Sequence, residues 1–357
     1  MRNQVLGILG GGQLGRMSAL AAARLGVKVH IFTAEENSPA AQVAAHTIVA
    51  DYGDEVALKE FAAGVDVISY EFENIPAQTV QFLKTLKPVY PDDRLLAASQ
   101  DRIAEKTYLN SIGIDTARFM AVSDAADIEK ALSEWGAGEI ILKTTRFGYD
   151  GKGQLRVSKN DDFTNVLAHF AGAPLIAEEI VPFERELSVI IARDKEGQME
   201  HYGPVHNEHR NHILHRSTYP CGSTDQVIEK ALQMTRTLAE KVDLIGVLAL
   251  ELFVTEDGSV LANEIAPRTH NSGHWSIDAC VTSQFENHVR AVCGFALGSG
   301  EAHSGAVMTN LIGTDILQIA DLAAQKNTAI HDYGKDDIRE GRKMGHYTVI
   351  SPLKNHK

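Results

Sequence analysis

The sequence predicts a mixed fold, with an α/β domain followed by an α+β region, in a chain of two or three domains. Strand and helix patterns alternate over roughly the first hundred residues, which indicates a parallel sheet wound right-handed. Further along, apolar strands flank glycine-containing turns, a pattern typical of antiparallel hairpins. At 357 residues, the chain is also longer than one typical domain.

The composition argues against several classes of protein. The net charge is −13 and no Lys/Arg-rich run occurs, so a nucleic-acid partner is not expected. The three cysteines, Cys221, Cys280 and Cys293, form no C-x-x-C pair, which argues against a disulfide scaffold or structural zinc and fits a reducing cytoplasm. No apolar stretch of membrane-spanning length occurs, and the N-terminus resembles a strand more than a signal peptide, so no membrane partner is expected.

The first part of the chain carries the parallel-sheet pattern. The apolar run Val5–Leu9 breaks into glycines and is followed by a helical pattern, Leu14–Leu25, which Gly26 closes. Strands are then expected at Val27–Phe32, Thr47–Val49 and Val65–Ser69. Near Pro88–Asp93 the pattern changes, so the first domain is expected to end close to residue 98.

Hairpins dominate the rest of the chain after one more helix, which is expected from about Ser99 to Ser111. A second, amphipathic helix is expected at Gln226–Val242. The expected strands are Ile140–Lys143, Leu155–Val157, Ile176–Glu179, Ser188–Ala192, Leu248–Val254 and Val260–Ile265.

A first glycine motif, Gly10, Gly12 and Gly15, satisfies G-x-G-x-x-G between a strand and a helix. One interpretation is a dinucleotide site, but that fingerprint needs an acid at the end of the second strand. Here that strand ends at Thr33, and Glu35 lies beyond it. The other interpretations are a tight turn that packs helix on strand, and a phosphate site for a mononucleotide-like substrate.

A second glycine loop follows Lys143, which ends an apolar strand. Gly148, Gly151 and Gly153 fall within six residues, so backbone N–H groups are free to approach an anion without hindrance from a Cβ atom. A strand lysine beside such a loop suits nucleotide phosphates. The loop is not a P-loop, because strands flank it on both sides, and a flexible hairpin tip is the alternative.

Two glutamates are predicted to face each other across a hairpin. If Asp257-Gly258 is a two-residue turn, paired residues have numbers that sum to 515, as those of Glu251 and Glu264 do. Their Cβ atoms would then lie about 5 Å apart in apolar strands, where like charges destabilise the fold. A divalent cation such as Mg²⁺, shared with substrate phosphates, would remove the conflict. The alternative is two solvated glutamates.

Histidines recur every third residue at 206, 209, 212 and 215, which suggests zinc. No Cys or Asp interleaves with them, and the apolar pair Ile213-Leu214 resembles the start of a strand. A strand would direct His212 and His215 to opposite faces. Polar loop histidines are therefore favoured over a metal site.

The order of these features resembles the ATP-grasp ligases: a strand lysine, a glycine-rich hairpin loop, a strand ending in glutamates, and paired metal glutamates. Within them, the chain resembles the 5-(carboxyamino)imidazole ribonucleotide synthases of purine biosynthesis over nearly its whole length. The stretches that carry this resemblance are GGGQLGRM, SYEFENIP, QDRIAEK, FGYDGKGQ, NEHRNHIL, NEIAPRTHNSGH and GRKMGH.

The resemblance implies an ATP-grasp fold with an N-terminal Rossmann-like (pre-ATP-grasp) domain, residues 1–98, and a small C-terminal β-rich domain, residues 301–357. The ATP-grasp domain would span residues 99–300, with a lid subdomain at about 115–180 and a metal and ATP subdomain at about 181–300. A cytoplasmic homodimer is expected from the family.

The resemblance also assigns roles to residues. Mg²⁺, or Mn²⁺ in its place, would be bound by Glu251 and Glu264. The catalytic candidates are Arg268, His270 and Asp150. ATP would be bound by Arg102, Lys143, Gly148, Tyr149, Asp150, Gly151, Lys152, Gly153, Gln154, Glu178, Glu179, Ile180, Val181, Glu186, His209, Asn263 and Glu264. The substrate would contact Gly12, Gln13, Leu14, Glu73, Asn271, Ser272, Arg342 and Lys343.

The implied reaction carboxylates 5-aminoimidazole ribonucleotide with ATP and bicarbonate, by way of carboxyphosphate. Two departures from the family pattern stand out: the chain stops eleven residues after His346, and Ala266 replaces the Asn of a Glu-x-Asn metal motif. The alternatives are another ATP-grasp ligase acting on a phosphorylated amine, an NAD-dependent oxidoreductase, and a non-catalytic nucleotide sensor. The paired glutamates argue against the sensor, because binding alone does not need them.

Overall fold

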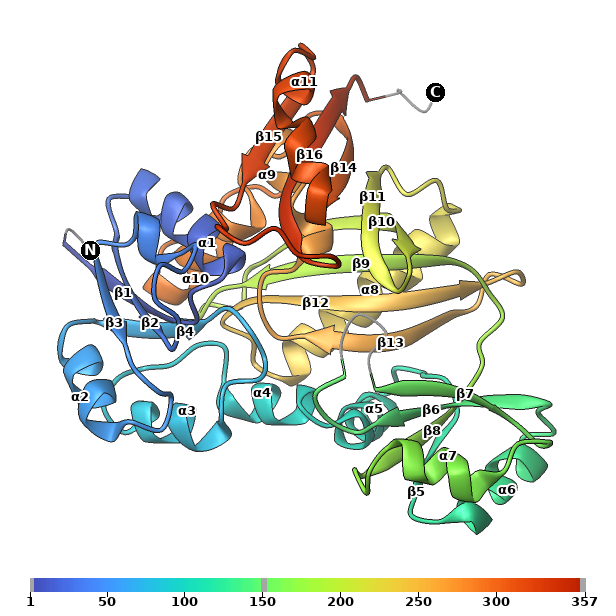
Figure 1. Cartoon of the computed structure of the whole chain (residues 1–357). Helices are drawn as coiled ribbons and strands as arrows, with labels where there is room; N and C mark the ends of the chain where they lie inside the picture. The colour runs from blue at the N-terminus through green and yellow to red at the C-terminus, as the bar shows by residue number, and fades with distance from the viewer. Residues whose placement is uncertain (1–2, 149–152, 354–357) are drawn as a thin grey trace.

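The computed structural model describes residues 3–148 and 153–353 and contains three sheets (Figure 1). The N-terminal sheet and a small sheet lie at two ends of a large eight-stranded sheet, which the C-terminal strands complete. The predicted site residues Tyr149, Asp150, Gly151 and Lys152 fall outside the described part of the chain. Among the described residues, no helix is long and apolar enough to cross a membrane.

The N-terminal sheet is parallel, as predicted, with the strand order β3-β2-β1-β4. Its core lies on both faces, with Phe32 and Phe61 on one side and Leu6 and Ile31 on the other. Helix α10 (Gln284–Cys293), from much later in the chain, packs against α1 across the second face. The strands are β1 (Val5–Leu9), β2 (Lys28–Thr33), β3 (His46–Val49) and β4 (Val67–Tyr70), and the helices are α1 (Gln13–Arg24), η1 (Ala41–Val43), α2 (Glu55–Ala63) and α3 (Ala77–Lys84).

The helix expected from about Ser99 to Ser111 is α5 (Arg102–Ser111), which starts three residues later than expected, and a separate helix that was not expected, α4 (Asp93–Ser99), precedes it. Asp101 adopts an extended conformation, and its carboxylate accepts the N–H groups of Ile103 and Ala104. Such an N-cap starts a new helix. The new start places Arg102 in the first turn of α5, facing the large sheet.

The small sheet is antiparallel, with the order β5-β8-β6-β7, and has its own apolar core. Its central hairpin, β6 (Glu139–Thr144) with β7 (Gln154–Ser158), places Lys143 opposite Gln154 beside the second glycine loop, as predicted. The remaining strands are β5 (Phe119–Val122) and β8 (Leu175–Glu179), and the helices are α6 (Ala125–Glu134) and α7 (Phe163–His169).

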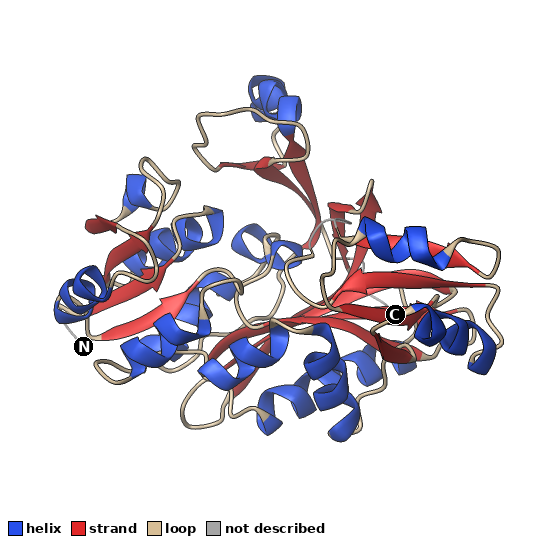
Figure 2. Ribbon diagram, turned by 60° about the horizontal axis from the view of Figure 1, so that its bottom comes forward, coloured by secondary structure: helices blue, strands red, loops and turns tan. Residues whose placement is uncertain are grey.

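The large sheet has the order β13-β12-β9-β10-β11-β14-β16-β15, so strands from the expected C-terminal domain join strands that precede residue 300. Figure 2 shows helices along one face of its long strands, and α8 (Asp225–Lys241) packs there on β9 and β12. Its strands are β9 (Phe183–Arg193), β10 (Met199–Arg210), β11 (Ile213–Tyr219), β12 (Gly246–Thr255), β13 (Val260–Ala266), β14 (Gly305–Ile312), β15 (Thr328–Asp332) and β16 (Lys343–Ser351). The short helices are η2 (Asn271–Gly273), α9 (Ser276–Ala279), α10 (Gln284–Cys293), η3 (Gly313–Gln318) and α11 (Ile319–Ala323).

The β12–β13 hairpin pairs Glu251 with Glu264, as predicted, although the turn differs from the expected one. Next to the turn, Val254 pairs with Val260, so the register is one residue away from that of a two-residue turn. A β-bulge between Glu251 and Leu252 restores the register. Bulges of this kind re-aim side chains next to functional sites, and here the bulge brings the two carboxylates level.

Candidate active site

One cavity of about 750 Å³ lies where the three sheets meet. Its walls come from the turn before α1, the end of β4, the start of α5, the β6–β7 hairpin and the β12–β13 hairpin. Residues far apart in the sequence therefore share one site. The predicted residues that line it are Gly12, Gln13, Leu14, Glu73, Arg102, Lys143, Gly148, Gln154, Glu186, His209, Glu251, Asn263, Glu264, Arg268, His270, Asn271 and Lys343.

The glutamate pair lies in this cavity, with a cationic or hydrogen-bonding partner on each carboxylate. Nε2 of His270 lies 3.0 Å from an oxygen of Glu251, and Nη1 of Arg102 lies 3.2 Å from an oxygen of Glu264. Burial would raise the pKa of Glu251, but His270, His209 and Arg268 outweigh it and lower that pKa overall. Glu251 is therefore held as a carboxylate, and both side chains of the pair offer oxygens, the donors that Mg²⁺ prefers.

Arg268 and Glu73 form an ion pair at the opposite wall. Nε of Arg268 lies 2.5 Å from the Glu73 carboxylate, and its Nη1 donates to the Thr269 carbonyl at 3.1 Å. Burial raises the pKa of Glu73, but the charge and hydrogen bond of Arg268 outweigh it and hold the pKa at about 2. An Arg pinned in this way is a preorganised cation facing the cavity.

The depressed pKa of Glu73 predicts how its contribution to stability depends on pH. A carboxyl whose pKa falls on folding stabilises the protein above its ordinary pKa and loses that contribution as the pH falls toward 2. Glu73→Gln is expected to lower the free energy of unfolding by about 2 kcal/mol at pH 7. Urea denaturation from pH 7 to pH 3 should show the difference from wild type shrinking, and a constant difference would contradict the ion pair.

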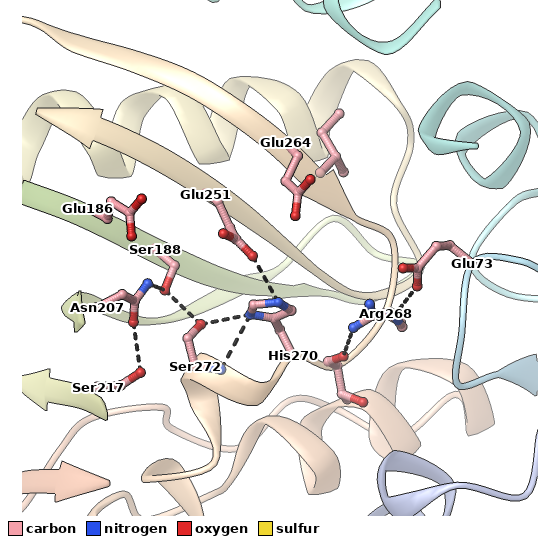
Figure 3. Close-up of polar contacts among 12 residues, drawn as sticks. Glu73, Glu186, Ser188, Asn207, Ser217, Glu251, Glu264, Arg268, His270 and Ser272 are labelled. Atoms are coloured by element: carbon pink, nitrogen blue, oxygen red, sulfur yellow. Dashed lines mark hydrogen bonds and ion pairs between the residues drawn. The ribbon is translucent and has the colours of Figure 1, made fainter. Parts of the chain in front are cut away.

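A chain of buried hydrogen bonds reaches His270 from the large sheet (Figure 3). Ser217 donates to Asn207 at 2.7 Å, Asn207 to Ser188 at 2.9 Å, and Ser188 to Ser272 at 2.7 Å. The Ser272 hydroxyl lies 2.8 Å from Nδ1 of His270.

Each hydroxyl or amide group in this chain donates its hydrogen bond in the direction of His270. Nδ1 of His270 therefore accepts the hydrogen bond from Ser272. Its other ring nitrogen, Nε2, then carries the proton that faces Glu251. In this arrangement, His270 is a hydrogen-bond donor to the cavity, and a role as base would need the ring to change its partners. Ser272 is fully buried and is not among the cavity-lining residues.

Lys143 forms an ion pair with the neighbouring strand β8 of the small sheet. Its Nζ lies 2.7 Å from the buried carboxylate of Glu178, whose other oxygen lies 3.5 Å from Nζ of Lys106. Burial raises the pKa of Glu178, but Lys143 and Lys106 outweigh it and lower the pKa overall. The lysine is therefore positioned at the mouth of the glycine hairpin, where a phosphate chain would lie.

The histidine run is a hairpin, and the expectation of loop histidines was wrong for three of the four. His206 and His209 lie on β10, His215 lies on β11, and His212 lies in the turn between them with a positive φ of 65°. Nδ1 of His209 contacts Glu186 of β9. Burial lowers the pKa of His209, but the hydrogen bond and charge of Glu186 raise it overall, so Glu186 favours the protonated form of this cavity histidine.

The only grouping of three or more possible metal ligands found among the described residues lies elsewhere, at Asp278, His331 and His346. The two histidine rings stack at 4.3 Å with 12° between their planes. Lone pairs of imidazole nitrogens lie in the ring plane, so two stacked rings do not direct them at one ion. Nε2 of His331 instead contacts Asp278 at 3.0 Å, which joins β15 to α9.

Comparisons with known proteins agree with this architecture along the whole chain. A family model described as ATP-grasp domain matches residues 107–285, and one described as ribonucleotide synthetase preATP-grasp domain matches residues 3–100. Residues 306–356 match the phosphoribosylaminoimidazole carboxylase C-terminal domain. An N5-carboxyaminoimidazole ribonucleotide synthase of Brucella melitensis is 48% identical over 349 residues, which cover 97% of this chain and 96% of the relative.

The chain belongs to the N5-carboxyaminoimidazole ribonucleotide synthase family. Among other members, the Bacillus subtilis synthase is 39% identical and covers 97% of this chain and 91% of its own length. A solved synthetase in complex with ADP superimposes with a TM-score of 0.94 at 38% identity, over 98% of this chain and 93% of that one. The Aspergillus clavatus synthase, solved with ADP and 5-aminoimidazole ribonucleotide, gives 0.91 at 30%, over 98% and 94%.

Membership of this family makes the chain an ATP-grasp ligase, and the large cavity lies between the small and large sheets, as the fold class requires. Some predicted residues lie beside the cavity and do not line it in this structure. Glu178 is buried behind Lys143, Glu179 pairs with Arg118, and Arg342 donates to the carbonyl of Asp337 at 3.0 Å. The others are Gly153, Ile180, Val181 and Ser272.

Sequence reasoning missed several cavity residues of the synthase fold. Phe183 and Phe253 stack at 4.7 Å on its wall. Glu105 is buried and accepts the N–H of Ile265 at 2.6 Å, and burial, with the charge of Glu264, raises its pKa to about 8. The acid at position 105, inside the helix expected from about Ser99 to Ser111, was a usable signal for Glu105, whereas nothing local singles out the two phenylalanines.

Proposed function

We propose that the chain carboxylates the amine of 5-aminoimidazole ribonucleotide, using ATP and bicarbonate, as the names of its relatives indicate. The observation that carries the proposal is the convergence in one cavity of a carboxylate pair, a strand lysine and a buried arginine. A dinucleotide oxidoreductase needs neither a carboxylate pair nor a lysine at a glycine hairpin.

Glu251 and Glu264 fit a divalent cation. They are the two members of one cross-strand pair, their donors are oxygens, and each contacts a cationic or hydrogen-bonding side chain, His270 or Arg102. Mg²⁺, or Mn²⁺, would be held by these two carboxylates, would neutralise their mutual repulsion and would supply positive charge for the phosphates of ATP. Arg102 donates to both Glu264 and the carbonyl of Gly148, so it links the metal pair to the glycine hairpin.

The reaction divides into two balanced steps. An oxygen of bicarbonate attacks the γ-phosphorus of ATP, ADP leaves, and carboxyphosphate forms. The amine nitrogen then attacks the carboxyl carbon, phosphate leaves, and the nitrogen loses its proton. Lys143 offsets the negative charge that spreads over the transferred group. Arg268 is suited to hold the planar bicarbonate through paired N–H groups.

Water must be kept from carboxyphosphate, which hydrolyses readily, and the small sheet with its glycine hairpin is placed to cover the cavity. The predicted base Asp150 lies outside the described residues. His270 donates through Nε2 in this structure, so we assign it to orienting Glu251 and the bicarbonate. A homodimer, a cytoplasmic location and the predicted domain boundaries stay predictions of the family resemblance.

The experiment that tests the proposal measures ADP release from purified protein with MgATP and bicarbonate. We expect release to depend on 5-aminoimidazole ribonucleotide. Turnover only with a different amine or carboxylate acceptor would retain the ATP-grasp ligase and reject this substrate. Binding of NADH without ATP consumption would reject the proposal altogether.

A further inference from the structure

The first glycine motif has an occupant from within the chain. Both carboxylate oxygens of Glu71, which follows β4, accept backbone N–H groups from the turn before α1. One oxygen contacts the N–H of Gly12, and the other accepts the N–H of Gly15 at 2.6 Å. The Glu71 residue is only 8% exposed. A carboxylate therefore lies where a dinucleotide fold would place a phosphate.

The two N–H groups are those that a capping box satisfies. Gly12 is the N-cap of α1 and Gly15 is its third helical residue, and no side chain of the helix itself caps it. In a capping box, two local side chains share this task. Here Glu71 makes both bonds from a segment more than fifty residues away.

All three motif glycines border the Glu71 side chain. A Cβ atom on Gly10 would lie 2.3 Å from Cγ of Glu71, and one on Gly12 would lie 2.7 Å from its Oε1. A Cβ on Gly15 would lie 3.3 Å from Oε2. At separations below 3.0 Å the Glu71 side chain would have to move, so the glycines at 10 and 12 make room for it in its present position. The motif is explained without any external phosphate.

Backbone N–H groups and nearby cations oppose the effect of burial on Glu71. Burial raises the pKa of the Glu71 carboxyl overall, and the N–H groups of Gly15 and Gly12, followed by Arg268 and Lys335, offset part of that rise. The N-terminus of α1 adds the positive end of its dipole. The helix and the carboxylate therefore stabilise each other.

We propose that Glu71 is a built-in anion that fills the phosphate position of the G-x-G-x-x-G turn, excludes dinucleotides from it, and positions the turn as a wall of the active site. Gln13 and Leu14, between its two backbone partners, line the cavity. Glu73, two residues further on, holds Arg268. Glu71 thus ties the turn to the segment whose Glu73 holds Arg268. As a claim about ribonucleotide binding, this rests on the proposed function.

The test removes the anion and then supplies another one. Glu71→Ala should raise the KM for 5-aminoimidazole ribonucleotide about tenfold, because the turn loses two backbone bonds, and leave the KM for ATP within about twofold. Sodium formate should enter the vacated space, lower the raised KM again and raise the Tm of the variant more than sodium chloride at equal ionic strength. Wild type should show no such preference for formate.

Glu286→Ala is the matched control, because Glu286 is a buried carboxylate that pairs with Arg290 outside the cavity. It should lose stability without a change in either KM and without rescue by formate. If Glu71→Ala does not fold, Glu71→Gln, which keeps the volume and one acceptor, should still raise the KM for the ribonucleotide alone.

Two results would overturn the inference: an unchanged ribonucleotide KM in both Glu71 variants, or a formate response no greater in Glu71→Ala than in Glu286→Ala. The Tm measurement needs no turnover. It therefore tests the built-in anion even if the wild-type protein does not use this ribonucleotide, so the two failures are distinguishable.

Discussion

Glu264→Gln is expected to lower ATP-dependent turnover about 100-fold or more, because it removes one of the two carboxylates that would hold the divalent cation. The substitution keeps the shape of the side chain, so the β12–β13 register should persist. It also removes the anionic partner of Arg102, which now lies 3.2 Å away. ADP release measured over a range of Mg²⁺ concentrations checks the prediction.

The shape of the Mg²⁺ dependence separates a metal ligand from a structural acid. Glu264→Asp keeps the charge and should regain part of the rate at high Mg²⁺, whereas Glu264→Gln should not. Glu208→Gln is the control, since Glu208 pairs with Arg216 on a half-exposed strand and does not line the cavity. If Glu264→Gln keeps the wild-type rate and Mg²⁺ dependence, the cross-strand pair is not the metal site.

The Glu251–Glu264 pair could be predicted from the sequence, but the local geometry of its hairpin could not. The pairing of Glu251 with Glu264 followed from the turn residues, and it is correct, but the turn and the bulge deviate from the expected hairpin by one residue each and cancel. Apolar runs on either side of turn residues carry the local signal that made the strands predictable. A bulge has no such signal, because one inserted residue changes no local propensity.

Contacts between distant segments were the part that sequence could not supply. The first glycine motif could be recognised from the strand and helix around it. The side chain that its N–H groups bind, Glu71, comes from the end of another strand. Ser188, deep in β9, has no feature that marks it as the support of Ser272. Such contacts depend on how the sheets pack against one another, and no local pattern of charge or polarity predicts that packing.

Arg268→Lys is expected to reduce ribonucleotide-dependent ADP release by about two orders of magnitude while ATP binding stays close to wild type. A guanidinium offers paired N–H groups to a planar anion and keeps a further N–H for its own anchor, whereas an ammonium offers a point charge. In this structure, Nε already holds Glu73 at 2.5 Å and Nη1 holds the Thr269 carbonyl. Lysine cannot satisfy these partners and bicarbonate together.

Arg156→Lys is the matched control, because Arg156 also pairs with a glutamate, Glu139, but lies exposed outside the cavity. It should leave the rate unchanged, since exposed ion pairs contribute little. For Arg268→Lys, the KM for bicarbonate should rise along with the fall in kcat, and ADP affinity, measured by calorimetry, should not move. If only the affinity for ADP falls, Arg268 contacts the nucleotide, and the proposed role of Arg268 in binding bicarbonate is wrong.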